Sequence, residues 1–167
     1  MPTTDRSSAA SHEARSPWLL TVAAFATFAA LMFALVDSQA GDAANAGPVV
    51  SASKEKLGRI LVDSSGRTLY LFEKDKNGRS ACSGQCASFW PPLIANAKPR
   101  AGAGVKASLL GRTRRADGRM QVTYNHHPLY RFAKDTKRGQ TKGEGLEAFG
   151  AEWYVVSSAG SKIDHDG

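Results

Sequence analysis

The sequence lacks the short motifs of the common enzyme classes. It has no serine in a glycine elbow, no phosphate-binding loop, no HExxH zinc motif and no CxxCH haem-attachment motif. These absences remove the usual sequence evidence for a serine hydrolase, a nucleotide-binding enzyme, a metalloprotease or a c-type cytochrome. We therefore expect a protein that is not an enzyme and that carries no cofactor.

Cysteine is also scarce, because only Cys82 and Cys86 are present and neither lies near the amino terminus. A lipid-modified amino terminus needs a cysteine beside the export signal, so that form of anchoring is excluded. Two closely spaced cysteines in an exported chain favour a disulfide, and closing so short a loop would stabilise the fold by about 2 kcal/mol. A copper site or a thiol-redox pair is the alternative, because thiolates select copper(I).

Charge is missing from residues 18–36, which are apolar apart from two threonines. A run of this length can span a bilayer, which takes about 17 to 25 residues, and Ser38 to Ala40 supply the small residues that signal peptidase needs. We predict a cytoplasmic n-region at residues 1–17 and a hydrophobic helix within residues 18–40, either a cleaved signal peptide or a membrane anchor. A buried helix is the third alternative. The first two place the remainder outside the cytoplasm, in the periplasm or the extracellular space.

Acidic residues are few after Ala40, where 20 Lys and Arg stand against 12 Asp and Glu, a net charge of +8. The densest basic stretch, residues 111–119, has no aromatic residue among its arginines and is interpreted as a solvated loop. A basic exterior attracts anionic lipid head groups, anionic polymers or nucleic acid. Because an exported protein rarely meets nucleic acid, we expect an envelope polymer or lipid as the partner.

The remaining chain alternates between short apolar runs and turn residues, which predicts strands. Residues 41–56 are rich in Ala, Gly and Ser and are predicted to be a flexible tether, and residues 158–167 a disordered tail. Between them, "RILVDSSGRTLYLFEKD" and "RMQVTYNHHPLYRFAKD" each fit strand, turn and strand. The expected fold is mainly β, a compact antiparallel domain built from two hairpin-based pseudo-repeats at residues 57–96 and 119–157.

The pattern Tyr-x-aromatic-x-x-Asp occurs once in each hairpin, and we name these two stretches the signatures. Side chains two apart share one face of a strand, so the aromatic pairs are expected in the core and the aspartates at turns. Buried tyrosine hydroxyls need partners, and the aspartates of the opposite hairpin are candidates. The alternative is an acidic pair that binds a cation or serves as general acid and base. The candidate binding residues are Tyr70, Phe72, Asp75, Tyr130, Phe132 and Asp135.

Three other residues invite interpretation. Trp90, before two prolines, is expected to seal the disulfide region as a core residue. His126 and His127 are adjacent and should point apart, so we expect no metal site from this pair alone. One of them could complete a copper site with the cysteines if the fold brings them together.

Together with "CSGQCASFWPPL", "AGAGVKASLLG", "QVTYNHHPLYRF" and "EWYVV", the signatures closely resemble the predicted bacterial lipoproteins and secreted-repeat proteins that share this motif. The resemblance covers residues 57–157 and implies an exported envelope protein with no established activity. We therefore expect a non-catalytic binding or structural module, with a copper or thiol-redox accessory protein as the alternative. Two features depart from the family. The lipid-attachment cysteine is absent, and His126 stands where relatives have a glycine that accepts positive φ easily.

Overall fold

The computed structural model describes residues 46–163, which form a mainly β domain. The predicted hydrophobic helix, the first part of the predicted tether and residues 164–167 lie outside the described residues. None of the helices found between residues 46 and 163 has the length and apolar character needed to span a membrane.

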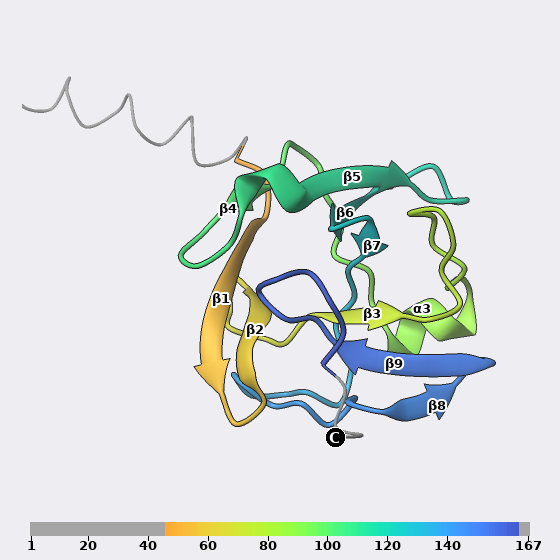
Figure 1. Ribbon diagram of the computed structural model, residues 1–167. Helices are drawn as coiled ribbons and strands as arrows, with labels where there is room; N and C mark the ends of the chain where they lie inside the picture. Colours follow the sequence, from red (N-terminus) through yellow and green to blue (C-terminus); the bar gives the residue numbers. More distant parts are fainter. Residues whose placement is uncertain (1–45, 164–167) are drawn as a thin grey trace, which may run out of the picture. The chain divides into compact units, whose positions relative to one another are not determined.

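The strands form three sheets of three strands each, ordered β2-β1-β4, β3-β9-β8 and β5-β6-β7 (Figure 1). All pairings within them are antiparallel except that of β1 with β4. The elements are β1 (Val49–Glu55), β2 (Gly58–Asp63), β3 (Tyr70–Phe72), α3 (Gln85–Phe89), β4 (Arg100–Ala101), a 3-10 helix (Ala107–Leu109), β5 (Leu110–Arg114), β6 (Met120–Tyr124), β7 (His127–Pro128), β8 (Leu146–Ala148) and β9 (Ala151–Val155).

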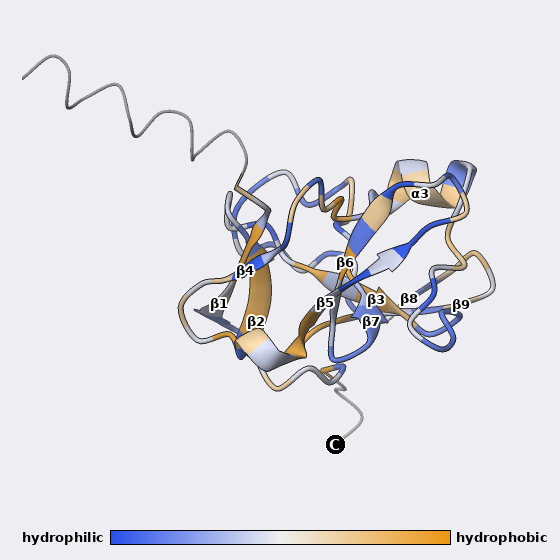
Figure 2. Cartoon of the chain, turned by 90° about the horizontal axis from the view of Figure 1, so that it is seen from above, coloured by the Kyte–Doolittle hydropathy of each residue, from blue (hydrophilic) through white to orange (hydrophobic). Residues whose placement is uncertain are grey.

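Continuous apolar runs such as "LYLF" and "WYVV" arise because the strands bury both of their faces. Leu69 and Leu71 belong to one core cluster, whereas Tyr70 and Phe72 belong to a second. Because side chains alternate along a strand, this one segment contributes residues to both core clusters. Hydrophobic residues are concentrated in strands such as β2, while hydrophilic residues occupy mostly the surrounding loops (Figure 2).

Both predicted ends of the domain were wrong. The predicted tether at residues 41–56 contains β1, which pairs with β2 from Val50 to Glu55. The sequence "VVSASKE" has only two large apolar residues, yet Val50 is fully buried. At the other end, the first part of the predicted tail at residues 158–167 is bound to the domain, because Ile163 donates a backbone hydrogen bond to Val155 O at 2.9 Å.

The predicted hairpins exist only in part. β2 and the segment before β3 meet at a single bridge, Val62 with Thr68, whereas the ladder partners of β2 and β3 are β1 and β9. In the second unit β6 does pair with the next strand, but that strand is only β7, and the "LYRFAKD" segment follows it without forming the long second strand that was expected. Distant strands compete successfully with the local partner because they bury the apolar face that a lone hairpin leaves exposed.

The basic stretch at residues 111–119 is a solvated loop only in part. Residues 111–114 belong to β5, which pairs with β6 from Leu110 opposite Tyr124 to Arg114 opposite Met120, whereas residues 116–119 form an exposed turn. The polar sequence "LGRTR" is tolerated as a strand because none of its five residues is buried. Backbone pairing with β6 holds it in the sheet.

Each predicted repeat unit contributes its final segment to the other unit. β9, from the end of the second unit, pairs with β3 of the first, with Phe72 opposite Trp153. In the reverse direction, Leu93 near the end of the first unit donates to Leu129 O at 2.9 Å and accepts from Val122 N at 2.8 Å. The two units are therefore interlocked rather than stacked side by side.

Candidate functional site

The two signatures meet at their tyrosines. Tyr70 N donates to Tyr130 O at 2.9 Å, and Tyr130 N donates to Tyr70 O at 3.0 Å. Equivalent residues of the two units thus exchange both backbone hydrogen bonds, as in a hydrogen-bonded antiparallel pair. This pairing relates the signatures by an approximate twofold axis.

The side chains of the signatures are also exchanged. The Tyr70 hydroxyl donates to Asp135 Oδ2 at 2.5 Å, and the Tyr130 hydroxyl donates to Asp75 Oδ2 at 2.8 Å. Both tyrosines have no exposed surface, and a buried hydroxyl without a partner costs about 1–3 kcal/mol. The prediction that the opposite aspartates satisfy these hydroxyls is confirmed.

The second oxygen of each aspartate holds a loop. Asp75 Oδ1 accepts from Ala81 N at 2.7 Å, and Asp135 Oδ1 accepts from Lys142 N at 3.0 Å. The expected turn-capping role is therefore found, but the capped N–H groups lie six and seven residues further along the chain. Each carboxylate therefore connects the loop that follows its own signature with the tyrosine of the other signature.

Burial controls the ionisation of these groups. It raises the pKa of Asp75 to about 6, although the hydrogen bonds from Ala81 N–H and the Tyr130 hydroxyl act in the opposite direction. Burial likewise raises the pKa of Asp135, against its bond from Tyr70. The pKa values of both phenols are raised far above their ordinary value by burial and by the neighbouring carboxylates. The tyrosines are thus neutral donors at any physiological pH.

The aromatic residues of the signatures belong to a stacked cluster. Trp90 stacks on Trp153 at 3.9 Å and on Phe132 at 4.3 Å between ring centroids, while Phe72 stacks on Trp153 at 4.0 Å. Trp90 is 1% exposed, so its predicted core position is confirmed. A Cβ at Gly143 would approach the Trp90 ring to 2.7 Å, so the polar loop that returns over this cluster requires glycine there.

The predicted disulfide is present between Cys82 and Cys86, with Cα atoms 5.3 Å apart. Both cysteines are buried in the aromatic cluster. The bond occupies both sulfur atoms, which the copper alternative needs as thiolates. Within residues 46–163 no three His, Cys, Asp or Glu side chains lie close enough together to hold a metal ion.

The histidines approach the first signature instead of the cysteines. His126 and His127 line an open cavity of about 440 Å³ together with Asp75. Asn125 and His126 have φ values of 46° and 66°, the two positive angles that a type I′ hairpin turn requires. The turn therefore has the geometry that favours glycine, although histidine stands at position 126. Burial and the neighbouring His126 lower the pKa of the half-buried His127.

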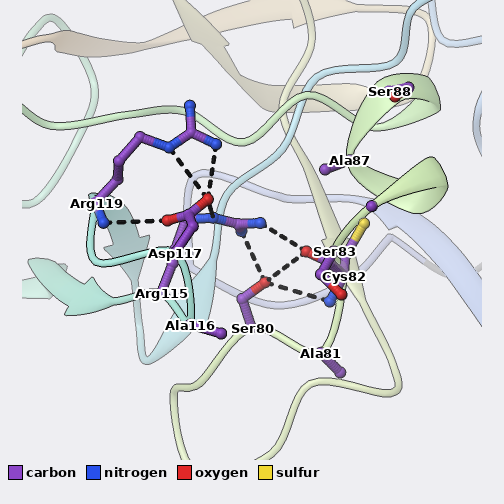
Figure 3. A pocket seen from close by; sticks show the side chains of 11 residues that line it. Ser80, Ala81, Cys82, Ser83, Ala87, Ser88, Arg115, Ala116, Asp117 and Arg119 are labelled. Atoms are coloured by element: carbon purple, nitrogen blue, oxygen red, sulfur yellow. Dashed lines mark hydrogen bonds and ion pairs between the residues drawn. The ribbon is translucent and has the colours of Figure 1, made fainter.

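Arg115 is a buried residue that the sequence interpretation missed. It is 5% exposed, and its guanidinium donates to Gln121 Oε1 at 2.6 Å. Figure 3 shows its two further bonds, to Cys82 O at 2.6 Å and to Ser80 Oγ at 2.8 Å. Ser80 Oγ also lies at hydrogen-bond distance, 2.7 Å, from the Tyr130 hydroxyl oxygen, whose own proton is donated to Asp75. One polar network thus joins the second signature to the disulfide loop, beside a cavity of about 390 Å³. In "GRTRRADGR" nothing distinguishes this arginine from its neighbours.

A second feature without a sequence prediction is an open apolar groove of about 270 Å³. Phe89, Leu146 and Phe149 line it and are 42%, 39% and 37% exposed. These are the exposed large hydrophobic side chains of the described residues, and all of them gather at this one place. We name it the apolar groove; the other lining residues are Trp90, Phe132, Lys134 and Ala148.

Comparison with known proteins gave one match. A family model described as a secreted repeat of unknown function matches residues 51–94 and 111–157, more than half of the chain. Its two copies begin earlier than the predicted repeat units and take in parts of β1 and β5. No curated protein and no solved structure is significantly similar to the chain.

Proposed function

Because the chain belongs to the family of secreted repeats of unknown function, we propose that it is an exported, non-catalytic binding module of the cell envelope, in which the signatures are scaffolding. The hydrophobic run at residues 18–36 would hold it at the membrane if it is retained after export. Its partner would be an anionic envelope component, either a polymer or lipid head groups.

The observation that carries this proposal is the saturation of the signatures. Each tyrosine hydroxyl donates to a carboxylate, and each carboxylate also accepts a backbone N–H. A catalytic acid or nucleophile needs an oxygen that can reach a substrate, and Asp135 is only 2% exposed. The polar groups of the two signatures are therefore directed at each other.

The exterior supplies what a binding module needs. The exported part carries a net charge of +8, which favours anionic partners through long-range attraction. The apolar groove adds a local contact surface of the kind that marks interaction sites on secreted domains.

The test uses residues 41–167, the form that signal peptidase would release. The described residues 46–163 form one compact unit that contains both core clusters, so this segment includes the packing of the domain. Cosedimentation with isolated cell envelopes should show saturable binding that weakens with salt. Asp75→Asn should bind as tightly as the wild type once the folded fraction is accounted for, because its carboxylate is engaged by the Tyr130 hydroxyl and by Ala81 N–H.

Two results would overturn the proposal. The first is an absence of binding to the envelopes. The second is an enzymatic activity, found in a screen of envelope polymers, that disappears in folded Asp75→Asn or Asp135→Asn variants. That activity would show that the carboxylates act on a substrate instead of holding the fold together.

A further inference from the structure

We infer that the apolar groove docks onto an anionic lipid bilayer, with aromatic side chains entering the head-group region and lysines contacting lipid phosphates. This inference rests on the proposed function and names the partner of the exposed surface. It draws on the turn that presents Phe149, on the exposed side chains and on the charges around them.

The turn between β8 and β9 presents Phe149 at a cost to the fold. Ala148 pairs with Ala151, and the two residues between them, Phe149 and Gly150, have φ values of 61° and 87°. A turn with two positive φ values favours Asn-Gly, and a bulky residue is an outlier at its first position. Backbone strain of this kind commonly marks a functional position, and the strained side chain here is an exposed aromatic ring.

The ring does not stand alone. Phe89, at the end of α3, lies 6.0 Å from Phe149 between ring centroids. Leu146 and Ala148 share one face of β8, and both line the apolar groove, while Glu147 between them lies on the other face opposite Glu152. The groove side of the hairpin is therefore apolar, and its carboxylates are directed away.

Three lysines lie beside this apolar surface. Lys134 lines the groove, the ammonium of Lys74 donates to Phe149 O at 3.1 Å, and that of Lys142 donates to Lys134 O at 3.4 Å. All three lysines are exposed. Exposed aromatic and leucine side chains ringed by lysine are typical of surfaces that lie in a membrane interface, and each lysine near an anionic surface contributes about 1 kcal/mol of attraction.

The shape favours a bilayer over an enclosed ligand. A volume of about 270 Å³ is below the range of about 300–1,000 Å³ for small-molecule pockets. The exposed hydrophobic side chains Phe89, Leu146 and Phe149 line this open groove. They can therefore enter the apolar part of a bilayer, and they need not enclose a small ligand. The positive rim complements phosphate groups better than it complements an apolar peptide.

The test measures binding of residues 41–167 to vesicles of equal parts phosphatidylglycerol and phosphatidylcholine, and to vesicles of phosphatidylcholine alone. Binding should require the anionic lipid and weaken with salt. Phe149→Asn should reduce it about tenfold by removing an inserted ring, yet keep or raise the melting temperature because asparagine suits this turn. Lys74→Gln and Lys134→Gln should each weaken binding about fivefold.

Lys98→Gln is the matched control. Lys98 is exposed just before β4, and both views place α3 and β8 on the side away from β4 (Figure 1, Figure 2). Its loss should change vesicle binding by roughly twofold or less, because screening limits distant charges.

Equal vesicle binding by wild type and Phe149→Asn would overturn the inference. So would self-association in sedimentation velocity that Phe149→Asn abolishes without any vesicle binding, because the groove would then belong to a second copy. Binding to isolated cell envelopes but not to lipid vesicles would refute this inference alone, and binding to neither would refute the proposed function as well.

Discussion

The exchanged tyrosine–aspartate bonds predict a measurable coupling between residues that lie 65 positions apart in the chain. Tyr70→Phe removes one hydroxyl and leaves Asp135 Oδ2 without its donor, in a side chain that is only 2% exposed. A hydrogen bond to a charged group contributes about 1.5–3 kcal/mol. We therefore expect the free energy of unfolding to fall by about 2–3 kcal/mol, which lowers the melting temperature by about 10 °C for a domain of this size.

The assay is a double-mutant cycle by urea unfolding, with Tyr70→Phe, Asp135→Ala and the combined variant. The two changes should be non-additive by about 1.5–3 kcal/mol, because each single change already breaks the same bond. Tyr154→Phe is the matched control, since that hydroxyl donates to Glu152, which is exposed and two residues away. It should cost about 1 kcal/mol or less.

The reasoning would be refuted by additive effects within error, or by equal destabilisation from Tyr70→Phe and Tyr154→Phe. Either result would mean that the aromatic stacking alone holds the signatures together and that the aspartates contribute nothing through the tyrosines.

Three further outcomes are expected. As pH falls from 7 to 4, the free energy of unfolding of the wild type should rise relative to that of Asp75→Asn by at most about 3 kcal/mol. The reason is that the pKa of Asp75 is about 6 in the folded protein, above the ordinary 3.8, so protonation favours the folded state. Denaturant titrations that find a constant difference between the two proteins across this range would contradict this prediction. Replacing Cys82 and Cys86 by serine should cost about 2 kcal/mol in calorimetry, and free thiols in the purified wild type would argue against the bond. Arg115→Met should lower the free energy of unfolding by about 3–4 kcal/mol, because it leaves buried acceptors without a donor. Replacing the exposed Arg114 by Met should change it by about 0.5 kcal/mol or less. Equal effects of the two substitutions in thermal melts would contradict a stabilising role of the Arg115 network.

The contacts at the centre of this molecule could be predicted from the sequence, because they follow from the chemistry and spacing of a few residues. A buried tyrosine hydroxyl must be satisfied, and the repetition of the signature offered only a few partners, so the Tyr70–Asp135 and Tyr130–Asp75 bonds could be predicted. The Cys82–Cys86 disulfide followed from spacing and export in the same way.

The remainder depends on pairing between distant segments, which no local pattern encodes. β1 looks like a linker because its side chains are small, yet it receives its order from β2 and β4. The partner of β3 is β9, about eighty residues away, and the buried position of Arg115 depends on where the disulfide loop returns. The apolar groove likewise forms only when the ends of α3 and β8 come together.

The interlocking of the repeat units has a consequence for any half of this molecule. A half that ends after Leu93 keeps Tyr70 and Asp75. It loses Asp135, which accepts from the Tyr70 hydroxyl, and Tyr130, whose hydroxyl donates to Asp75. It also loses the strand that covers β3. Each of the two fragments would lack a complementary surface, which a second, similar fragment could supply. The smallest form of this architecture that can fold by itself is therefore a pair of units, whether or not the two are covalently joined.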